Sequence, residues 1–214
     1  MNELAELNNC THCVFFEARK PFELFLWISE CPSGPSVKFH VQSIYSIDEM
    51  NTLGNFTIGS RPILSFDSSF SNTESGQSIQ KLLTDVFNTP AGHRKGDRYS
   101  FFDHVIHFSR LDGKIWFRQY QIHEGKAAEI SVDGLSFEEI GPRFILNPIK
   151  LFNGSFGGQT VWANNAFVTP AAIKASKNQV KSNKYVKRIA SLDESKRRKQ
   201  ESTLGIDEHS KLFE

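Results

Sequence analysis

Apolar and polar residues alternate along several short stretches of this chain, as they do in β-strands that bury one face. Two of these stretches, residues 101–109 and 114–122, flank Leu111-Asp112-Gly113, and Asp-Gly between alternating runs is a strong signal for a β-hairpin. In the second stretch Phe117 falls on one face, and Trp116 and Arg118 fall on the other. Residues 22–29 and 36–44 predict a further hairpin, because the turn-forming residues 31–35 join them.

The strand predicted at residues 36–44 has one apolar and one polar face. Val37 and Phe39 alternate there with Lys38 and His40, so we expect the first pair in the core and the second in water. A phosphate group can reach Lys38 in that arrangement, whereas a lone histidine such as His40 is more often simply solvated.

Residues 137–158 carry the most distinctive backbone signals. Gly141-Pro142 separates two apolar runs, because proline lacks an N–H and glycine accepts turns that other residues resist. The following stretch alternates as a strand until Pro148, which predicts an edge or a bulge. It ends in a loop whose glycines allow close backbone approach: Gly154, Gly157 and Gly158. Because the stretch holds no nucleophile, metal cage or phosphate-binding loop, we interpret it as a binding surface.

Two stretches have helical periodicity. Residues 78–87 place four aliphatic residues along one side, which predicts an amphipathic helix. Residues 171–192 contain no acidic residue, and their cations step by three or four, so we expect them to line one face of a helix. These cations are Lys174, Lys177, Lys181, Lys184, Lys187 and Arg188. Like charges at this spacing repel, so this helix should form when a polyanion or a partner covers it.

The two halves of the chain resemble each other. Each contains a strand with a tryptophan, followed by Gly-Pro at the start of another strand: Trp27 with Gly34-Pro35, and Trp116 with Gly141-Pro142. We therefore predict an α/β (α+β) domain at residues 1–170, with halves at about 1–98 and 99–170. Each half should hold a small, mostly antiparallel sheet with a packed helix. Residues 171–214 are predicted to be a basic tail, helical or disordered.

Composition and charge narrow the class of protein. The 214 residues are 39% hydrophobic and include 19 phenylalanines, which is enough for a packed core. No apolar run approaches the roughly 20 residues of a membrane span, so we expect no membrane association. The net charge is only +1, but residues 171–214 hold 11 Lys/Arg against 6 Asp/Glu. A basic tail on a near-neutral body is typical of a protein whose body recognises the shape of its partner and whose tail binds that partner by electrostatic attraction. A solubilising tail is the alternative.

The residues do not form a catalytic set. Glu138 and Glu139 are neighbours on a predicted strand and so point to opposite faces, and no serine lies in a nucleophile-elbow context. Cys10-Thr-His-Cys13, with Cys31 as a further ligand, suggests zinc, but such sites usually pair two knuckles and the second is absent. We therefore expect no enzyme activity, small-molecule substrate, metal or cofactor.

RNA binding fits the residues better. Each phosphate that a cation neutralises releases counterions, and exposed aromatic residues can stack on bases. The candidate contacts in the body are Arg19, Lys20, Lys38, Arg61, Arg94, Lys95, Arg143, Lys150 and Phe156. Three alternatives stay open: Phe156 packs in the core, Arg143 pairs with Glu138 or Glu139, and residues 89–97 form a plain linker.

Several motifs in order along residues 2–170 resemble the Brix-domain family. They are NCTHCVFFEARK (9–20), LFLWIS (24–29), GPSVKF (34–39), GSRPILSFD (59–67), DHVIHFSRLDGKIWFRQYQI (103–122), IGPRF (140–144) and GSFGG (154–158). The resemblance implies two halves, each similar to the anticodon-binding domain of certain aminoacyl-tRNA synthetases. Domains of this family open with a strand and a helix, and this chain begins near the end of that helix.

The resemblance also implies a function. It suggests a nucleolar factor that assembles the large (60S) ribosomal subunit by binding pre-rRNA, assembly factors and ribosomal proteins. The residues themselves supply only a neutral body with a basic tail and no catalytic set. The main alternative is a protein–protein scaffold in pre-ribosomal particles that does not recognise RNA directly.

Overall fold

The computed structural model describes residues 1–20, 23–50, 52, 54, 56–57, 59–88, 102–124 and 135–202. The chain divides into two compact units, Met1–Phe167 and Val168–Glu214, and each is described by itself. The first unit holds all the strands of the described residues together with two α-helices, and the second holds one long helix. The predicted mixed α+β class is confirmed.

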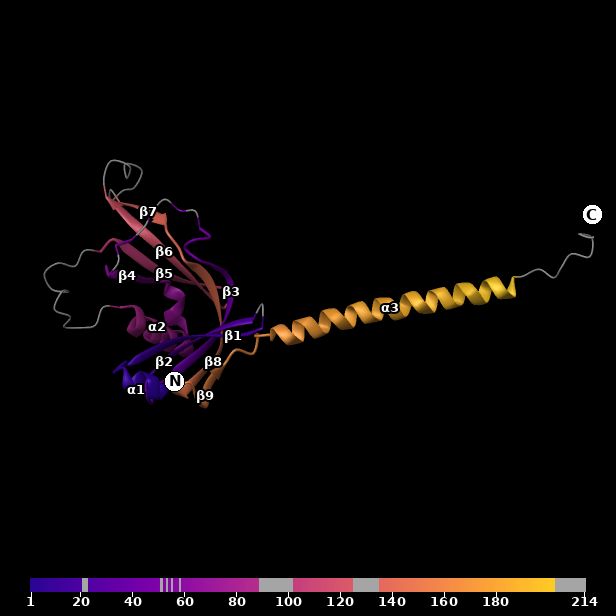
Figure 1. Ribbon diagram of the computed structural model, residues 1–214, viewed down its shortest axis with the longest axis horizontal. Coiled ribbons are helices and arrows are strands. Elements are labelled where there is room, and N and C mark those ends of the chain that lie inside the picture. Colours follow the sequence, from indigo (N-terminus) through magenta and orange to yellow (C-terminus); the bar gives the residue numbers. More distant parts are fainter. Residues whose placement is uncertain are drawn as a thin grey trace, which may run out of the picture. The chain divides into compact units, whose positions relative to one another are not determined.

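The strands of the first unit form one nine-stranded sheet (Figure 1). They are β1 (His12–Lys20), β2 (Glu23–Glu30), β3 (Ser36–Tyr45), β4 (Pro62–Phe66), β5 (His104–Leu111), β6 (Lys114–Glu124), β7 (Leu135–Glu139), β8 (Arg143–Gly154) and β9 (Gly157–Ala163). The main order is β1-β2-β3-β8-β6-β5-β4, with β7 paired to β6 and β9 paired to β8.

A single sheet corrects the prediction of two small sheets. The join is the antiparallel pair of β3 and β8, in which Val41 lies opposite Leu146 and Val37 lies opposite Leu151. These four side chains are buried, so pairing the two strands makes one continuous apolar face. A second join crosses the expected boundary near residue 98, because β4 pairs in parallel with β5 through Pro62 opposite His104.

One face of the sheet packs against α2 (Glu74–Phe87), which follows a short 3-10 helix, η1 (Ser68–Asn72). Thr73 caps α2, since its hydroxyl accepts a hydrogen bond from the Gly76 N–H at 3.1 Å. The helix contacts β1 and β2 at one end of the strand order and β4 at the other, so the sheet curls around it (Figure 1). The core between them includes Phe39 and Phe108, both fully buried.

Two local predictions about the backbone are borne out. The Pro148 position is a bulge, because Lys38 pairs with Lys150 and Phe39 with Pro148, which leaves Ile149 extra on β8. Gly141, at the break between β7 and β8, has φ +65°, a conformation that residues with a Cβ rarely adopt.

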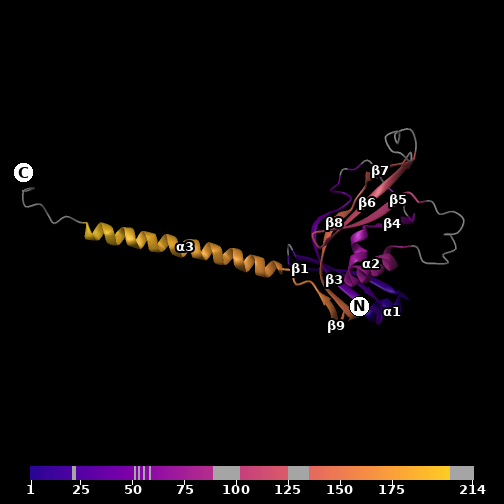
Figure 2. The ribbon, with the colours of Figure 1, turned by 180° about the vertical axis from the view of Figure 1, so that it is seen from behind.

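The second unit contains α3 (Pro170–Glu201), which confirms the predicted basic helix and extends it beyond residue 192 (Figure 2). It begins at Thr169, whose hydroxyl accepts a hydrogen bond from the Ala172 N–H at 3.2 Å. None of its residues is buried. Within the described ranges, no helix is both long enough and apolar enough to span a lipid bilayer. The first unit contains one more helix, α1 (Asn2–Leu7).

Candidate nucleic-acid interface

The face of the sheet opposite α2, called the outer face below, carries five of the nine candidate residues of the body. Cross-strand partners share a face, so the registers of the strands define it. It contains Phe15, Glu17 and Arg19 on β1, Phe25 and Trp27 on β2, Lys38 and His40 on β3, Trp116, Arg118 and Tyr120 on β6, and Arg143, Ile145, Lys150 and Phe152 on β8. Aromatic and cationic side chains from several strands therefore share this face.

Glu17 joins three neighbours at one end of the outer face. Its Oε1 accepts from Arg19 Nε at 2.6 Å, and its Oε2 accepts from Lys38 Nζ at 3.0 Å and from Trp27 Nε1 at 3.1 Å. Burial alone would raise the pKa of Glu17, but the three hydrogen bonds outweigh it and lower the pKa to about 2. The carboxylate is therefore charged at every physiological pH.

This arrangement corrects the expectation that Lys38 and His40 face water. Only 14% of the Lys38 side chain is exposed, and its Nζ lies 4.8 Å from the centroid of the Phe25 ring and 4.6 Å from that of Trp27. His40 is buried beside Phe25 and Phe167, and this burial lowers its pKa. The alternation correctly separated the two faces, but large side chains from neighbouring strands cover the second face as well. The charge of Lys38 is already neutralised by Glu17.

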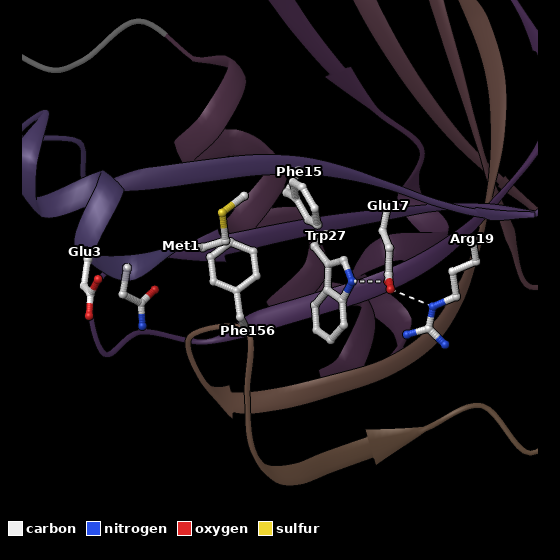
Figure 3. Close-up of a pocket in the computed structure, with 8 residues that line it drawn as sticks. Met1, Glu3, Phe15, Glu17, Arg19, Trp27 and Phe156 are labelled. Atoms are coloured by element: carbon white, nitrogen blue, oxygen red, sulfur yellow. Dashed lines mark hydrogen bonds and ion pairs between the residues drawn. The ribbon is translucent and has the colours of Figure 1, made fainter.

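Next to Glu17 the surface is hollowed (Figure 3). The hollow has a volume of about 480 Å³ and is lined by Phe15, Glu17, Arg19, Trp27 and Phe156 together with Met1, Asn2 and Glu3. Phe156 is half-buried, and its ring lies 6.1 Å from that of Trp27, which stacks in turn on Phe152 at 5.7 Å. Phe156 therefore lies on the outer face and not in the core against α2.

A second group of cations lies where β6 and β8 meet. Arg118 Nη1 and Arg143 Nη1 lie 4.0 and 3.9 Å from Glu139 Oε2, so the alternative in which Arg143 pairs with Glu139 is realised. The Arg143 guanidinium lies 4.7 Å from the centroid of the Tyr45 ring, and that of Arg118 lies 5.5 Å from the centroid of Trp116. Two cations share one anion here, which leaves a net charge of +1.

The remaining body candidates are scattered. Lys150 is exposed beside the bulge of β8, and Arg61 is exposed just before β4. The side chain of Lys20 and all of Arg94 and Lys95 lie outside the described residues. The glycines and prolines of the predicted motifs lie at turns: Gly34 and Pro35 between β2 and β3, Gly141 and Pro142 between β7 and β8, and Gly154, Gly157 and Gly158 at the β8–β9 hairpin.

On α3 the basic residues form a long stripe. Lys174, Lys177, Lys181, Lys184 and Arg188 follow each other at steps of three and four, so they lie along one face. Lys187 follows Lys184 by three residues and lies at the edge of the same face. All six residues are exposed. The described helix holds 10 Lys/Arg and 3 Asp/Glu, and the ion pair between Arg198 and Glu194 joins two of these.

The described residues show no metal-binding cluster of three or more His, Cys, Asp or Glu side chains. Cys10, Cys13 and Cys31 are free thiols, and burial raises the pKa of Cys13. Glu138 and Glu139 take successive positions on β7 opposite Gln121 and Tyr120, so they point to opposite faces as the sequence predicts.

Sequence reasoning missed Glu17, Trp27, Tyr45 and Trp116 as parts of the interface. Glu17 is the only acidic residue of β1 and lies in the sequence FFEARK. Its position between aromatic and basic residues was the signal that could have identified it as part of the interface. The other three residues were assigned to strands, but their neighbours come from strands far away in sequence. Only the sheet order shows that Tyr45 and Trp116 lie on either side of β8.

Comparisons with known proteins identify the family. The family model described as "Brix domain" matches residues 1–150. Ribosome biogenesis protein BRX1 homolog 1 of Arabidopsis thaliana is 40% identical over 218 residues, covering 100% of this chain and 69% of the relative. Ribosome biogenesis protein BRX1 of Saccharomyces cerevisiae is 41% identical over 97% of this chain and 72% of its own length, and the BRX1 homolog of Homo sapiens is 41% identical over 94% and 54%. The chain belongs to the Brix-domain family.

Proposed function

We propose that this protein is a non-catalytic factor of ribosome biogenesis that binds pre-rRNA during assembly of the large (60S) subunit in the nucleolus. Its relatives are named ribosome biogenesis proteins, and these names support a role in ribosome biogenesis. The distribution of cations supports RNA as the ligand. Other assembly factors and ribosomal proteins of the same particles are the expected protein partners.

The stripe of cations on α3 is the observation that carries this proposal. Its five members repeat regularly over 15 residues, which places them within about 21 Å along the helix axis at 1.5 Å per residue. All are exposed, and none forms an ion pair with another described residue. Cations arranged in this way neutralise phosphates along an RNA backbone without reading its sequence.

The test compares RNA binding by the full chain and by a variant in which Lys174, Lys177, Lys181, Lys184 and Lys187 are all replaced by Glu. Fluorescence anisotropy with a structured fragment of large-subunit rRNA, measured between low and physiological salt, gives the affinity and its salt slope. Each lost phosphate contact reduces the slope by about 0.7–0.9, so for five contacts we expect a reduction of about 3.5–4.5 together with a large loss of affinity.

A matched control separates a specific stripe from bulk charge. The pair Lys177→Glu/Lys181→Glu changes the net charge as much as the pair Lys81→Glu/Lys114→Glu, which lies on α2 and β6 in the first unit. The first pair should weaken binding and the second should not. Equal effects of the two pairs, or no effect of the fivefold variant, would contradict the proposal. A tRNA competitor tests whether binding favours rRNA.

A protein–protein scaffold is the second candidate function, and β1 favours it. This strand lies at one end of the main strand order, and Val14 and Phe16 on its α2 side are 42% and 48% exposed. An exposed edge strand with apolar side chains can pair with a strand of another chain. Unchanged RNA affinity of the fivefold variant, with retained association with pre-ribosomal particles, would favour this function.

A further inference from the structure

The outer face has two further hollows, one on each side of Arg118 along β6. The first, of about 220 Å³, is lined by Tyr45, Trp116, Arg118, Arg143 and Ile145 with parts of their neighbours. The second, of about 230 Å³, is lined by Val105, His107, Tyr120 and Phe137. Each hollow therefore has aromatic walls, and the two belong to the same strand.

The side chains that border the two hollows follow one another along β6. Trp116, Arg118 and Tyr120 occupy alternate positions and so project from the same face, with about 7 Å between successive residues. Arg118 lies between Trp116, whose ring lines the first hollow, and Tyr120, whose ring lines the second. The sequence of groups is thus aromatic, cationic, aromatic.

The rings of this region are accessible. Tyr45, at the end of β3, is 44% exposed and Phe137, on β7, is 59% exposed, while Trp116 and Tyr120 are partly exposed. The Arg143 guanidinium already lies over the Tyr45 ring, so the first hollow is bordered by planar groups of both kinds. Flat rings and guanidinium planes are the groups on which proteins stack unpaired bases.

The arginines keep donors available. Neither Arg118 nor Arg143 comes closer than 3.9 Å to the Glu139 carboxylate, which is longer than a hydrogen bond. Among the described residues, neither guanidinium donates a hydrogen bond to any other side chain or carbonyl. Each guanidinium has five N–H donors, so a phosphate oxygen can be bound without breaking an existing hydrogen bond.

We propose that the two hollows beside Arg118 bind two unstacked bases of single-stranded RNA, with the phosphate between them on Arg118. This inference rests on the proposed function and adds the form of RNA and its place. The order base, phosphate, base matches the order Trp116, Arg118, Tyr120. The net positive charge of the two arginines and Glu139 complements the phosphate. The binding is tolerant of sequence, because every base presents a flat face.

The test uses the full chain, a 12-nucleotide single-stranded RNA of mixed sequence, and a 12-base-pair RNA duplex as probes. The variant Trp116→Leu/Tyr120→Leu removes both rings and keeps apolar side chains in the strand. It should lose about tenfold or more in affinity for the single strand, because each stacked base contributes that order of affinity, and should bind the duplex as the wild type does. Thermal melting checks that the variant is folded.

Arg118→Gln is a second variant that leaves both rings in place. It should weaken single-strand binding and reduce the salt slope by about one, as expected for one phosphate contact. Phe16→Leu is the matched aromatic control, since Phe16 is half exposed on the opposite face of β1, and it should change nothing.

The outcomes separate this inference from the proposed function. If the double variant and Arg118→Gln both bind the single strand as the wild type does while the α3 variant loses affinity, the inference is wrong and the proposed function stands. In that case the hollows serve another occupant, such as an apolar side chain of a protein partner. If the wild type binds neither probe in dilute buffer, the proposed function and the inference both fail.

Discussion

Replacing Glu17 by Gln is expected to destabilise the first unit in a way that depends on pH. The carboxylate accepts hydrogen bonds from Arg19, Lys38 and Trp27, and these lower its pKa from the ordinary value of 4.5 to about 2. At 1.36 kcal/mol per pKa unit, the difference corresponds to roughly 3 kcal/mol of stability. Solvent reaches 24% of the side chain, and screening reduces the expected contribution to about 1–2 kcal/mol.

The sign of the pH dependence follows from the lowered pKa. The folded state holds the charged carboxylate more strongly than the unfolded chain does, so the stabilisation is complete above about pH 5 and is lost as the pH falls from 4.5 toward 2. Glutamine does not titrate. The difference in free energy of unfolding between wild type and Glu17→Gln should therefore be about 1–2 kcal/mol at pH 7 and close to zero near pH 2.

Urea unfolding followed by tryptophan fluorescence measures this difference, since Trp27 is a partner of the carboxylate. Glu6→Gln serves as the control, because Glu6 is exposed on α1 and should change the free energy of unfolding by less than about 0.5 kcal/mol at any pH. A difference for Glu17→Gln that is equally large at pH 7 and pH 2.5 would refute the reasoning, as would no difference at pH 7.

Three further predictions concern stability and are measured by the same unfolding assay. Phe39→Ala should cost about 3–5 kcal/mol, because Phe39 is fully buried between the sheet and α2. Gly141→Ala should lower the free energy of unfolding by about 1–2 kcal/mol, since φ is +65° and the new Cβ would lie 2.7 Å from the Sδ of Met50. Gly157→Ala is the control and should be nearly neutral, because a Cβ at Gly157 would lie in open space. Similar losses of stability for the two variants would contradict the prediction. Thr73→Ala should cost about 1 kcal/mol by removing the N-cap of α2, and Thr73→Ser should restore most of it.

Local sequence patterns were sufficient for the individual strands and for the long helix. Alternation along β6 correctly placed Phe117 and Trp116 on opposite faces, and Asp112-Gly113 correctly marked the hairpin. Pro148 correctly predicted a bulge, because a missing N–H affects the strand that contains it. Information of this kind is carried by residues close together in sequence.

Pairing between distant strands could not be predicted in the same way. β3 and β8 are more than 90 residues apart, and nothing in either strand specifies the other, so two sheets were expected where one exists. The same limit applies to the candidate site. Lys38 was expected in water because alternation shows which residues share a face, but not that Phe25 and Trp27 on the next strand cover it.

The absence of buried residues from α3 has a kinetic consequence. At 1.5 Å per residue its 32 residues extend over about 48 Å, so the helix presents its charges across a span longer than that of many whole domains. The field of these charges extends into the solution around the helix, so it attracts a polyanion such as RNA and accelerates their encounter. Added salt should therefore slow association before it hastens release.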